Sequence, residues 1–234
     1  MLHHLALLFL APVFIAQGHY VRKITPKLEE AVGPRQGRVG QGKQLRILLL
    51  GDSAAAGVGA ESQSQALSGQ LVRALCDHFE LEWQLLAQSG LTTKDTRQKL
   101  AQHPKQPYDV VIVSLGVNDV TQPLSSLSWI QQQKALISQI RQHFSCHQII
   151  LTKIPPMEKF PALPHPLRWY LGSKAKTFNH QLSRWTATQT DCELVEINHQ
   201  LSADHMASDG FHPGPAIYQC WGKTIARVIH SRWS

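Results

Sequence analysis

The stretch LRILLLGDSAAAGVGA, from Leu45 to Ala60, decides the fold of this 234-residue chain. It opens with an apolar run and ends in small residues and glycines, and Gly51-Asp52-Ser53 lies between the two parts. An apolar run of this length, bounded by a turn signal, predicts a strand that is buried on both faces. Ser53 therefore directly follows a buried strand, where it can serve as a turn residue, as part of a phosphate-binding loop or as a nucleophile.

Apolar segments of strand length alternate with amphipathic segments of helix length along the rest of the chain. Strands are predicted at 45–51, 81–88, 109–116, 148–154 and 193–198. Helices are predicted near 64–80, 92–102, 126–144, 171–189 and 215–231. Because neighbouring parallel strands need helical crossovers, this alternation predicts one α/β domain over residues 45–234. We expect a three-layer α/β/α sandwich with a five-stranded parallel sheet.

The residues that follow these strands are the types that nucleophilic catalysis requires. Ser53 follows the first strand, Gly90 the second and Asn118 the third, and Asp209 and His212 lie downstream of the fifth. A serine hydroxyl becomes a good nucleophile when an imidazole takes its proton and a carboxylate orients that imidazole. Right-handed crossovers bring the carboxyl ends of parallel strands to one edge of the sheet. We therefore expect Ser53, His212 and Asp209 to meet there as a relay.

Three hydrogen-bond donors are expected at the same edge: the backbone N–H groups of Ser53 and Gly90 and the side-chain amide of Asn118. Donors placed in this way stabilise the oxyanion of a tetrahedral intermediate. Each residue alone has an ordinary alternative, because Gly-Asp-Ser and Asn-Asp sequences are common in turns and helix caps. Their ordered appearance at the strand ends of one sheet favours the catalytic interpretation, since independent turns have no reason to follow that order.

At these residues the sequence resembles the SGNH hydrolase family, also called GDSL-like lipases and esterases. The resemblance rests on four ordered blocks: GDSAAAG with Ser53, AQSGLTT with Gly90, LGVNDVT with Asn118, and DGFHPG with Asp209 and His212. It implies a flavodoxin-like SGNH hydrolase fold and a serine esterase that forms an acyl-enzyme on Ser53, with Asp209 and His212 completing the catalytic triad. It also implies an oxyanion hole made by Ser53, Gly90 and Asn118, an ester substrate, and no need for a metal or another cofactor.

Other kinds of catalytic or binding site find little support in the sequence. It contains no G-x-S-x-G elbow, no G-x-x-x-x-G-K-[ST] loop and no G-x-G-x-x-G motif. The 13 histidines and four cysteines show no metal-binding spacing. A phosphate-binding loop is therefore a poor interpretation of the opening stretch, and the nucleophile interpretation of Ser53 is preferred.

The N-terminus, residues 1–18, is predicted to be a separate apolar segment. Its apolar part, LALLFLAPVFIA from Leu5 to Ala16, is shorter than the about 20 residues that a membrane-spanning helix needs. That length suits a membrane anchor lying at the interface or a signal peptide. The residues Ala16-Gln17-Gly18 are compatible with a cleavage site, which leaves export to the periplasm as an alternative.

Residues 19–44 are predicted to be a basic linker. The net charge of the chain is +7, and the seven Lys and Arg and two Glu between 20 and 46 contribute +5 of it. A basic stretch behind an apolar one favours an anionic membrane surface and the cytoplasmic face, and the remaining charge does not predict a nucleic-acid partner. Cys146 and Cys192 each open a predicted strand, so a bridge between them is compatible with the alternative of export.

The Pro-rich segment PPMEKFPALPHPLRWYLG, residues 155–172, leaves the fourth strand beside the expected site. Phe160, Leu163 and Trp169 are its candidate substrate-binding residues, and a rigid connection that caps the core is the alternative. Together with the N-terminus, the segment favours acyl-chain or lysophospholipid-like esters near a membrane. A deacetylase or acyltransferase acting on a glycan, and a non-catalytic lipid- or glycan-binding module, remain alternatives.

Overall fold

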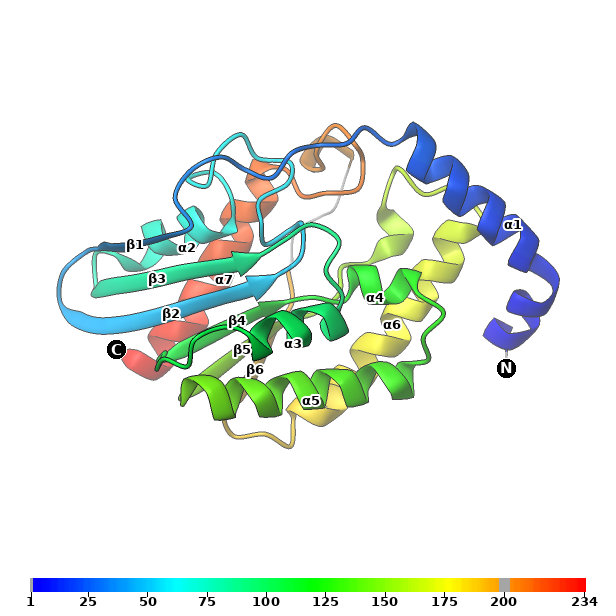
Figure 1. Cartoon of the computed structure of the whole chain (residues 1–234). Coiled ribbons are helices and arrows are strands. Elements are labelled where there is room, and N and C mark those ends of the chain that lie inside the picture. Colours follow the sequence, from blue (N-terminus) through cyan, green and yellow to red (C-terminus); the bar gives the residue numbers. More distant parts are fainter. Residues whose placement is uncertain (1, 198–202) are drawn as a thin grey trace.

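A six-stranded sheet forms the centre of the molecule in the computed structural model, which describes residues 2–197 and 203–234 (Figure 1). The strands are β1 (Gln36–Val39), β2 (Lys43–Gly51), β3 (Phe79–Ala87), β4 (Val110–Ser114), β5 (Gln148–Thr152) and β6 (Cys192–Val195). Their spatial order is β1-β3-β2-β4-β5-β6, and β2 to β6 run parallel. The predicted parallel sheet is therefore confirmed. Its last strand ends at Val195, and residue 198 of that prediction lies outside the described residues.

Helices cover both faces of the sheet and complete the three layers (Figure 1). The α-helices are α1 (Leu2–Ile24), α2 (Leu67–Leu75), α3 (Thr93–Ala101), α4 (Val117–Thr121), α5 (Ser126–Phe144), α6 (Leu167–Thr186) and α7 (Pro215–Trp233), and of these α1 lies outside the layers, against α6. β2 sends Leu48 and Leu50 into the core shared with α3, α5 and α6, and it sends Ile47 and Leu49 into the core shared with α2 and α7. Side chains of this strand alternate between two buried faces, which explains its continuous apolar sequence.

Strand β1 corrects the expected number of strands and the expected linker. It lies within residues 19–44 and pairs antiparallel with β3, with Gln36 opposite Gln84 and Val39 opposite Leu81. All four of its residues are exposed, so the strand has no apolar alternation that a sequence pattern could detect. Backbone pairing with β3 is what defines it, and β2 then begins at Lys43.

Helix α1 is longer than the apolar segment that predicted it, and it packs against α6 (Figure 1). The Phe14 ring stacks on Tyr170 of α6 with centroids 4.6 Å apart, and both Phe14 and Val21 are buried. The Gln17 side chain donates to the carbonyl of His165 at 2.6 Å and accepts the N–H of Leu167 at 3.0 Å. In the described part of the chain, no helix combines the length and the apolar character that crossing a bilayer demands.

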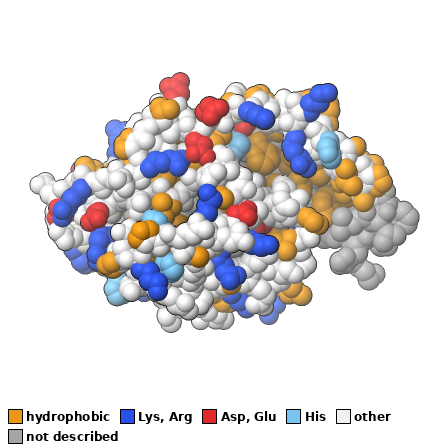
Figure 2. Space-filling view, in the orientation of Figure 1, with side chains coloured by type: hydrophobic (Ala, Val, Ile, Leu, Met, Phe, Trp, Pro, Cys, Tyr) orange, Lys and Arg blue, Asp and Glu red, His pale blue; other side chains and the backbone are white. Residues whose placement is uncertain are grey.

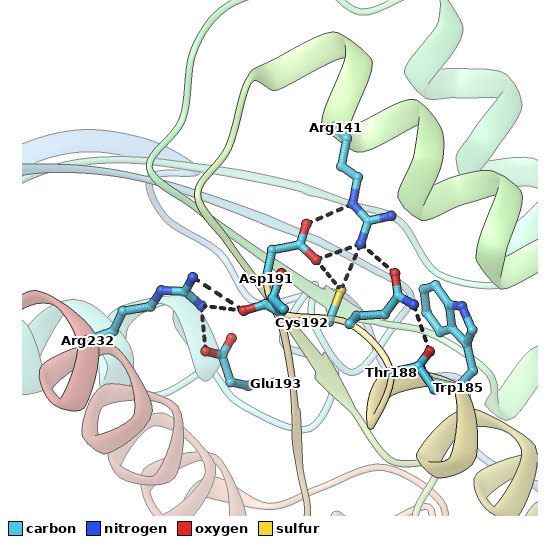
Figure 3. A network of polar contacts seen from close by, with 9 residues as sticks. Arg141, Trp185, Thr188, Asp191, Cys192, Glu193 and Arg232 are labelled. Atoms are coloured by element: carbon cyan, nitrogen blue, oxygen red, sulfur yellow. Dashed lines mark hydrogen bonds and ion pairs between the residues drawn. The ribbon is translucent and has the colours of Figure 1, made fainter.

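A network of polar contacts joins α5, β6 and α7 at the amino end of β6 (Figure 3). Arg141 of α5 donates from Nε and Nη2 to the two carboxylate oxygens of Asp191, at 2.7 and 2.6 Å. Arg232 of α7 donates to Glu193 at 2.8 Å. The hydrogen bonds from Arg141 hold the pKa of Asp191 below its usual value, against the effect of burial. Two arginines thus connect the last strand to the helices on both faces of the sheet.

The four cysteines are free thiols. Cys192 Sγ lies 3.5 Å from the Asp191 carboxylate, inside the network of Figure 3. Burial raises the pKa of Cys192 to about 12 and that of Cys146 to about 11, so both thiols stay protonated near neutral pH. The bridge between Cys146 and Cys192 that was considered from the sequence is not present.

Candidate active site

Ser53 lies in the tight turn that leaves the carboxyl end of β2. The N–H of Asp52 donates to the carbonyl of Ser114 in β4 at 3.2 Å, so the turn begins against the neighbouring strand. A Cβ atom at Gly51 would lie 2.3 Å from the Ala55 Cβ and 2.7 Å from the Ser114 oxygen. Only glycine therefore lets the chain fold back this tightly. The turn places Ser53 at the edge of the sheet where ligands bind in this architecture.

Two buried groups support the Ser53 turn from within the domain. Asp52 Oδ1 accepts the N–H of Ala54 at 3.1 Å, and burial raises the pKa of this carboxyl to about 7. The Tyr218 hydroxyl, at the start of α7, donates to the carbonyl of Val58 at 2.6 Å, and the N–H of Val58 donates to the carbonyl of Ser53 at 3.0 Å. The turn is thus anchored to the helix that directly follows the His212 loop.

The loop before α7 brings His212 and Asp209 to Ser53. His212 Nε2 lies 2.8 Å from Ser53 Oγ, and His212 Nδ1 lies 2.5 Å from Asp209 Oδ2. The other carboxylate oxygen of Asp209 accepts the N–H groups of Phe211 and His212, at 2.9 and 3.0 Å. Burial alone would raise the pKa of Asp209, but these hydrogen bonds lower it below its usual value, so the group is a carboxylate. The carboxylate accepts a hydrogen bond from the Nδ1–H group of His212, so Nε2 carries no proton and can accept a hydrogen bond from the Ser53 hydroxyl.

Asn118 and Gly90 lie together beside this relay. Asn118 lies in the first turn of α4, and its Nδ2 donates to the carbonyl of Leu91 at 3.0 Å. Gly90, the residue before Leu91, has a φ of +84°, a conformation that favours glycine. A Cβ at Gly90 would meet no atom within 4 Å, so the space beside this backbone is open. The two segments that were predicted to supply oxyanion donors are therefore connected by a hydrogen bond.

Asp119 holds the Asn118 loop in place through long-range hydrogen bonds. Its buried carboxylate accepts the N–H of Thr93 at 3.2 and 3.1 Å and the Thr93 hydroxyl at 3.0 Å. Gln133 of α5 donates to the same hydroxyl at 2.9 Å. Among residues 2–197 and 203–234, no group of His, Cys, Asp and Glu is arranged to hold a metal ion. Asp119 thus joins α3, α4 and α5, and it does not contact the relay.

A cavity of about 690 Å³ is lined by residues of α1, α4 and α6 and by Phe211, the residue before His212. Figure 2 shows it as a hollow lined by hydrophobic side chains beside α1. Of the three residues predicted to bind substrate, Leu163 belongs to the lining. Phe160 is buried against Phe211, with ring centroids 5.1 Å apart, and Trp169 is partly exposed on α6. The Pro-rich segment thus contributes to the cavity through Leu163 and the first turns of α6.

The sequence matches the model of the GDSL-like lipase/acylhydrolase family over residues 49–220. This match covers the Ser53 turn, the Asn118 loop and the His212 loop. The chain belongs to this family. It is therefore a carboxylic ester hydrolase with the SGNH-type fold, as the four sequence blocks predicted.

Solved structures of esterases share this fold. A lipolytic protein of the G-D-S-L family from Veillonella parvula is 13% identical, with a TM-score of 0.63 over 80% of this chain and 98% of that one. The aryl esterase of M. smegmatis is 21% identical, with a TM-score of 0.60 over 80% and 99%. Est24, a carbohydrate acetylesterase from Sinorhizobium meliloti, is 20% identical, with a TM-score of 0.59 over 80% and 99%. No curated protein matches the sequence. At these identities the likeness shows the fold and not the substrate.

The part of the cavity made by α1 was not predicted. The sequence interpretation treated residues 1–18 as a separate apolar segment and residues 19–44 as a linker, whereas Phe14, Gly18 and Val21 line the cavity in the structure. A signal was present, because Ala11, Phe14, Gly18 and Val21 follow the spacing of three and four residues that places side chains on one helix face. The stripe was not recognised because the residues around it are also apolar, as is typical of membrane anchors and signal peptides.

Proposed function

We propose that this esterase forms an acyl-enzyme on Ser53. His212 Nε2 takes the hydroxyl proton as Ser53 Oγ attacks the ester carbonyl, and Asp209 keeps the other ring proton on Nδ1. The N–H groups of Ser53 and Gly90 and the Asn118 amide stabilise the oxyanion. His212 then gives its proton to the departing alcohol, and water attacks the acyl-enzyme by the same steps. The observation that carries the proposal is the continuous hydrogen-bonded chain from Ser53 through His212 to Asp209.

Acyl-chain esters of the lysophospholipid type are the proposed substrates. Phe211, the neighbour of His212, and Asn118 belong to the lining of the cavity, so an acyl chain attached to Ser53 has an apolar space close by to enter. Its volume of about 690 Å³ lies in the range that small-molecule sites occupy. Lys174 and Arg22 add two cations to the lining, and burial lowers the pKa of Lys174 to about 8. Lys174 therefore stays mostly charged at neutral pH, which suits a phosphate group on the substrate.

The proposal includes docking of α1 to an anionic membrane, at the cytoplasmic face. Ile15, Tyr20 and Ile24 are apolar side chains with more than half of their surface exposed, at 62%, 57% and 53%. Lys23 in the last turn of α1 and Lys27 after it are exposed cations. Apolar and basic side chains on one helix are what an anionic interface binds. Export to the periplasm is the alternative location.

A second candidate function, removal of acetyl groups from a glycan, is favoured by a different hollow. This hollow, of about 380 Å³, lies beyond α4 and is lined mainly by polar residues, including Thr92, Asp95 and Gln132. A sugar hydroxyl array would find hydrogen-bond partners there, and the S. meliloti structure is that of a carbohydrate acetylesterase. An acetyl substrate would leave the apolar cavity beside α1 empty, which is why acyl-chain esters are preferred.

Hydrolysis of p-nitrophenyl esters from acetyl to palmitoyl by the full chain and by its Ser53→Ala variant tests these proposals. We expect turnover that depends on Ser53 and is highest for acyl chains of medium or greater length. An optimum at acetyl would favour the glycan deacetylase, and activity that survives in Ser53→Ala would refute the acyl-enzyme. Cosedimentation with vesicles of phosphatidylserine and phosphatidylcholine, compared with phosphatidylcholine alone, tests the membrane. Equal binding to both vesicles would remove the anionic surface from the proposal.

A further inference from the structure

One face of α1 belongs to the wall of the cavity. Ala11, Phe14, Gly18 and Val21 recur at spacings of three and four residues, and all four line the cavity. This spacing places their side chains in one stripe along the helix. The opposite wall comes from α6, through Leu167, Tyr170, Leu171 and Lys174. α1 and α6 thus form two facing walls of the cavity, and without α1 the cavity would be open on that side.

Helix α1 is held firmly enough to act as a wall. Phe14 and Val21 are buried in the same core cluster as the side chains of α5 and α6. The stacking of Phe14 on Tyr170 fixes the middle of the helix, and the two hydrogen bonds of Gln17 fix it to the chain just before and at the start of α6. Phe14 and Gln17 precede Gly18 and Val21 follows it, so contacts on both sides fix the position of Gly18 relative to α6.

Gly18 contributes no side chain to this wall. A Cβ built there would meet one neighbour within 4 Å, Arg22 Nη2 at 3.7 Å, which is an ordinary contact with the mobile end of a long side chain. Gly18 therefore has no steric need to be glycine, and helix propensity would favour almost any other residue. What its missing side chain leaves behind is space in the cavity. Neither a steric clash nor the backbone conformation requires glycine at position 18. A need for space for a ligand explains the glycine better.

We propose that α1 is a part of the substrate site and that Gly18 sets the length of acyl chain that the cavity accepts. This inference rests on the proposed acyl-chain esterase and adds its specificity-determining residue. A larger side chain at this position would project between α1 and α6 and take the place of substrate carbon atoms. It would therefore discriminate against long acyl chains and affect short ones less.

The test compares Gly18→Leu with Ala16→Leu in the full chain. Ala16 lies on the same helix but is exposed and outside the cavity lining, so this control adds a leucine of the same size that points away from the cavity. The readout is the ratio of kcat/KM for p-nitrophenyl octanoate to that for p-nitrophenyl acetate. Each methylene that loses its contacts lowers kcat/KM about fourfold, so loss of two or three predicts a fall in the ratio of at least tenfold for Gly18→Leu. We expect Ala16→Leu to stay within twofold of wild type.

A second variant and a binding measurement complete the test. Val21→Ala enlarges the cavity. For p-nitrophenyl esters with acyl chains longer than the wild-type optimum, we expect this variant to have a higher kcat/KM, relative to that for the acetate, than wild type. Binding of cis-parinaric acid, followed by its fluorescence in the Ser53→Ala background, should weaken at least tenfold with Gly18→Leu and remain unchanged with Ala16→Leu. Circular dichroism establishes that each variant folds.

Each outcome decides between the two proposals. A Gly18→Leu ratio and a parinaric acid affinity that both equal wild type would overturn the role of Gly18 while the Ser53 esterase stands. If wild type showed no turnover that depends on Ser53, the proposed acyl-chain esterase would be refuted. The binding measurement would still decide the role of Gly18. If wild type failed to bind parinaric acid as well, the cavity would not be an acyl site and the inference would be wrong.

Discussion

Replacing Asp209 by asparagine should abolish general-base catalysis by His212, because it changes which ring nitrogen carries the proton. Asp209 Oδ1 accepts two backbone N–H groups, and Oδ2 faces His212 Nδ1 at 2.5 Å. In Asp209→Asn the amide oxygen keeps the two backbone bonds, so the NH₂ group faces Nδ1. Because an amide N–H donates, Nδ1 becomes the acceptor and the ring proton moves to Nε2. There it blocks the transfer of the proton from Ser53.

The size of the effect follows from this change of tautomer. Loss of the general base should lower kcat by about 10⁴. The free energy of unfolding should change little, because the backbone bonds to residue 209 persist. Asp209→Ala removes the acceptor as well and leaves two N–H groups of the loop without a partner, which should lower the free energy of unfolding by about 1–3 kcal/mol. Comparison of the two variants therefore separates the effect of Asp209 on the His212 tautomer from its effect on the stability of the loop.

The assay measures kcat on p-nitrophenyl butyrate and urea unfolding for wild type, Asp209→Asn and Asp209→Ala. Asp204→Asn is the matched control, because it removes the same charge from an exposed position five residues earlier in the chain. We expect this control to keep the wild-type kcat. A kcat of Asp209→Asn within tenfold of wild type would refute the argument, since His212 would then have kept its tautomer without the carboxylate.

Three other predictions concern stability. Asp119→Asn places an NH₂ group against the donors of the first turn of α3, so the free energy of unfolding measured in urea should fall by about 1–3 kcal/mol; an unchanged value would contradict the buried hydrogen bonds. Arg141 holds the pKa of Asp191 below its unfolded value of about 3.9, so the stability difference between wild type and Asp191→Asn should be complete above that pH and shrink as the pH falls through the lowered pKa. A difference that grows in acid would refute this sign. Phe14→Ala removes the stack on Tyr170, so trypsin should cleave after the basic residues of α1 at least several times faster; equal cleavage rates would mean that α1 is not docked through this ring.

The parallel sheet was predictable because its strands are buried on both faces. The side chains of β2 pack into two cores, one on each face of the sheet, and for this reason its sequence is continuously apolar. The helix predicted at 126–144 coincides with α5, whose N-cap is Ser125 and whose last residue precedes Ser145 in the left-handed conformation. β1 escaped prediction because hydrogen bonds to β3 define it and its side chains all face solvent.

The positions of Ser53, Asp209 and His212 followed from the topology, since parallel strands deliver their carboxyl ends to one edge of the sheet. The cavity did not follow, because it depends on how α1 docks on α6. Composition alone suggested Trp169, but helix geometry turns this residue away from the face that carries Tyr170 and Leu171. Which aromatic side chains of a Pro-rich segment line a cavity depends on tertiary packing, and the sequence pattern does not contain that information.

Strand β1 has a consequence for any shortened form of the protein. It pairs with residues 81–84 on the outer side of β3, which would otherwise present unpaired N–H and C=O groups at this edge. Arg38 of β1, paired with Glu80 at 2.9 Å, adds charge along this border. A form that begins after Val39 would lose the protecting strand and expose a template for strand pairing between molecules. Self-association of such a form would then reflect an uncovered sheet edge, and β1 would be the element that protects the longer chain against aggregation.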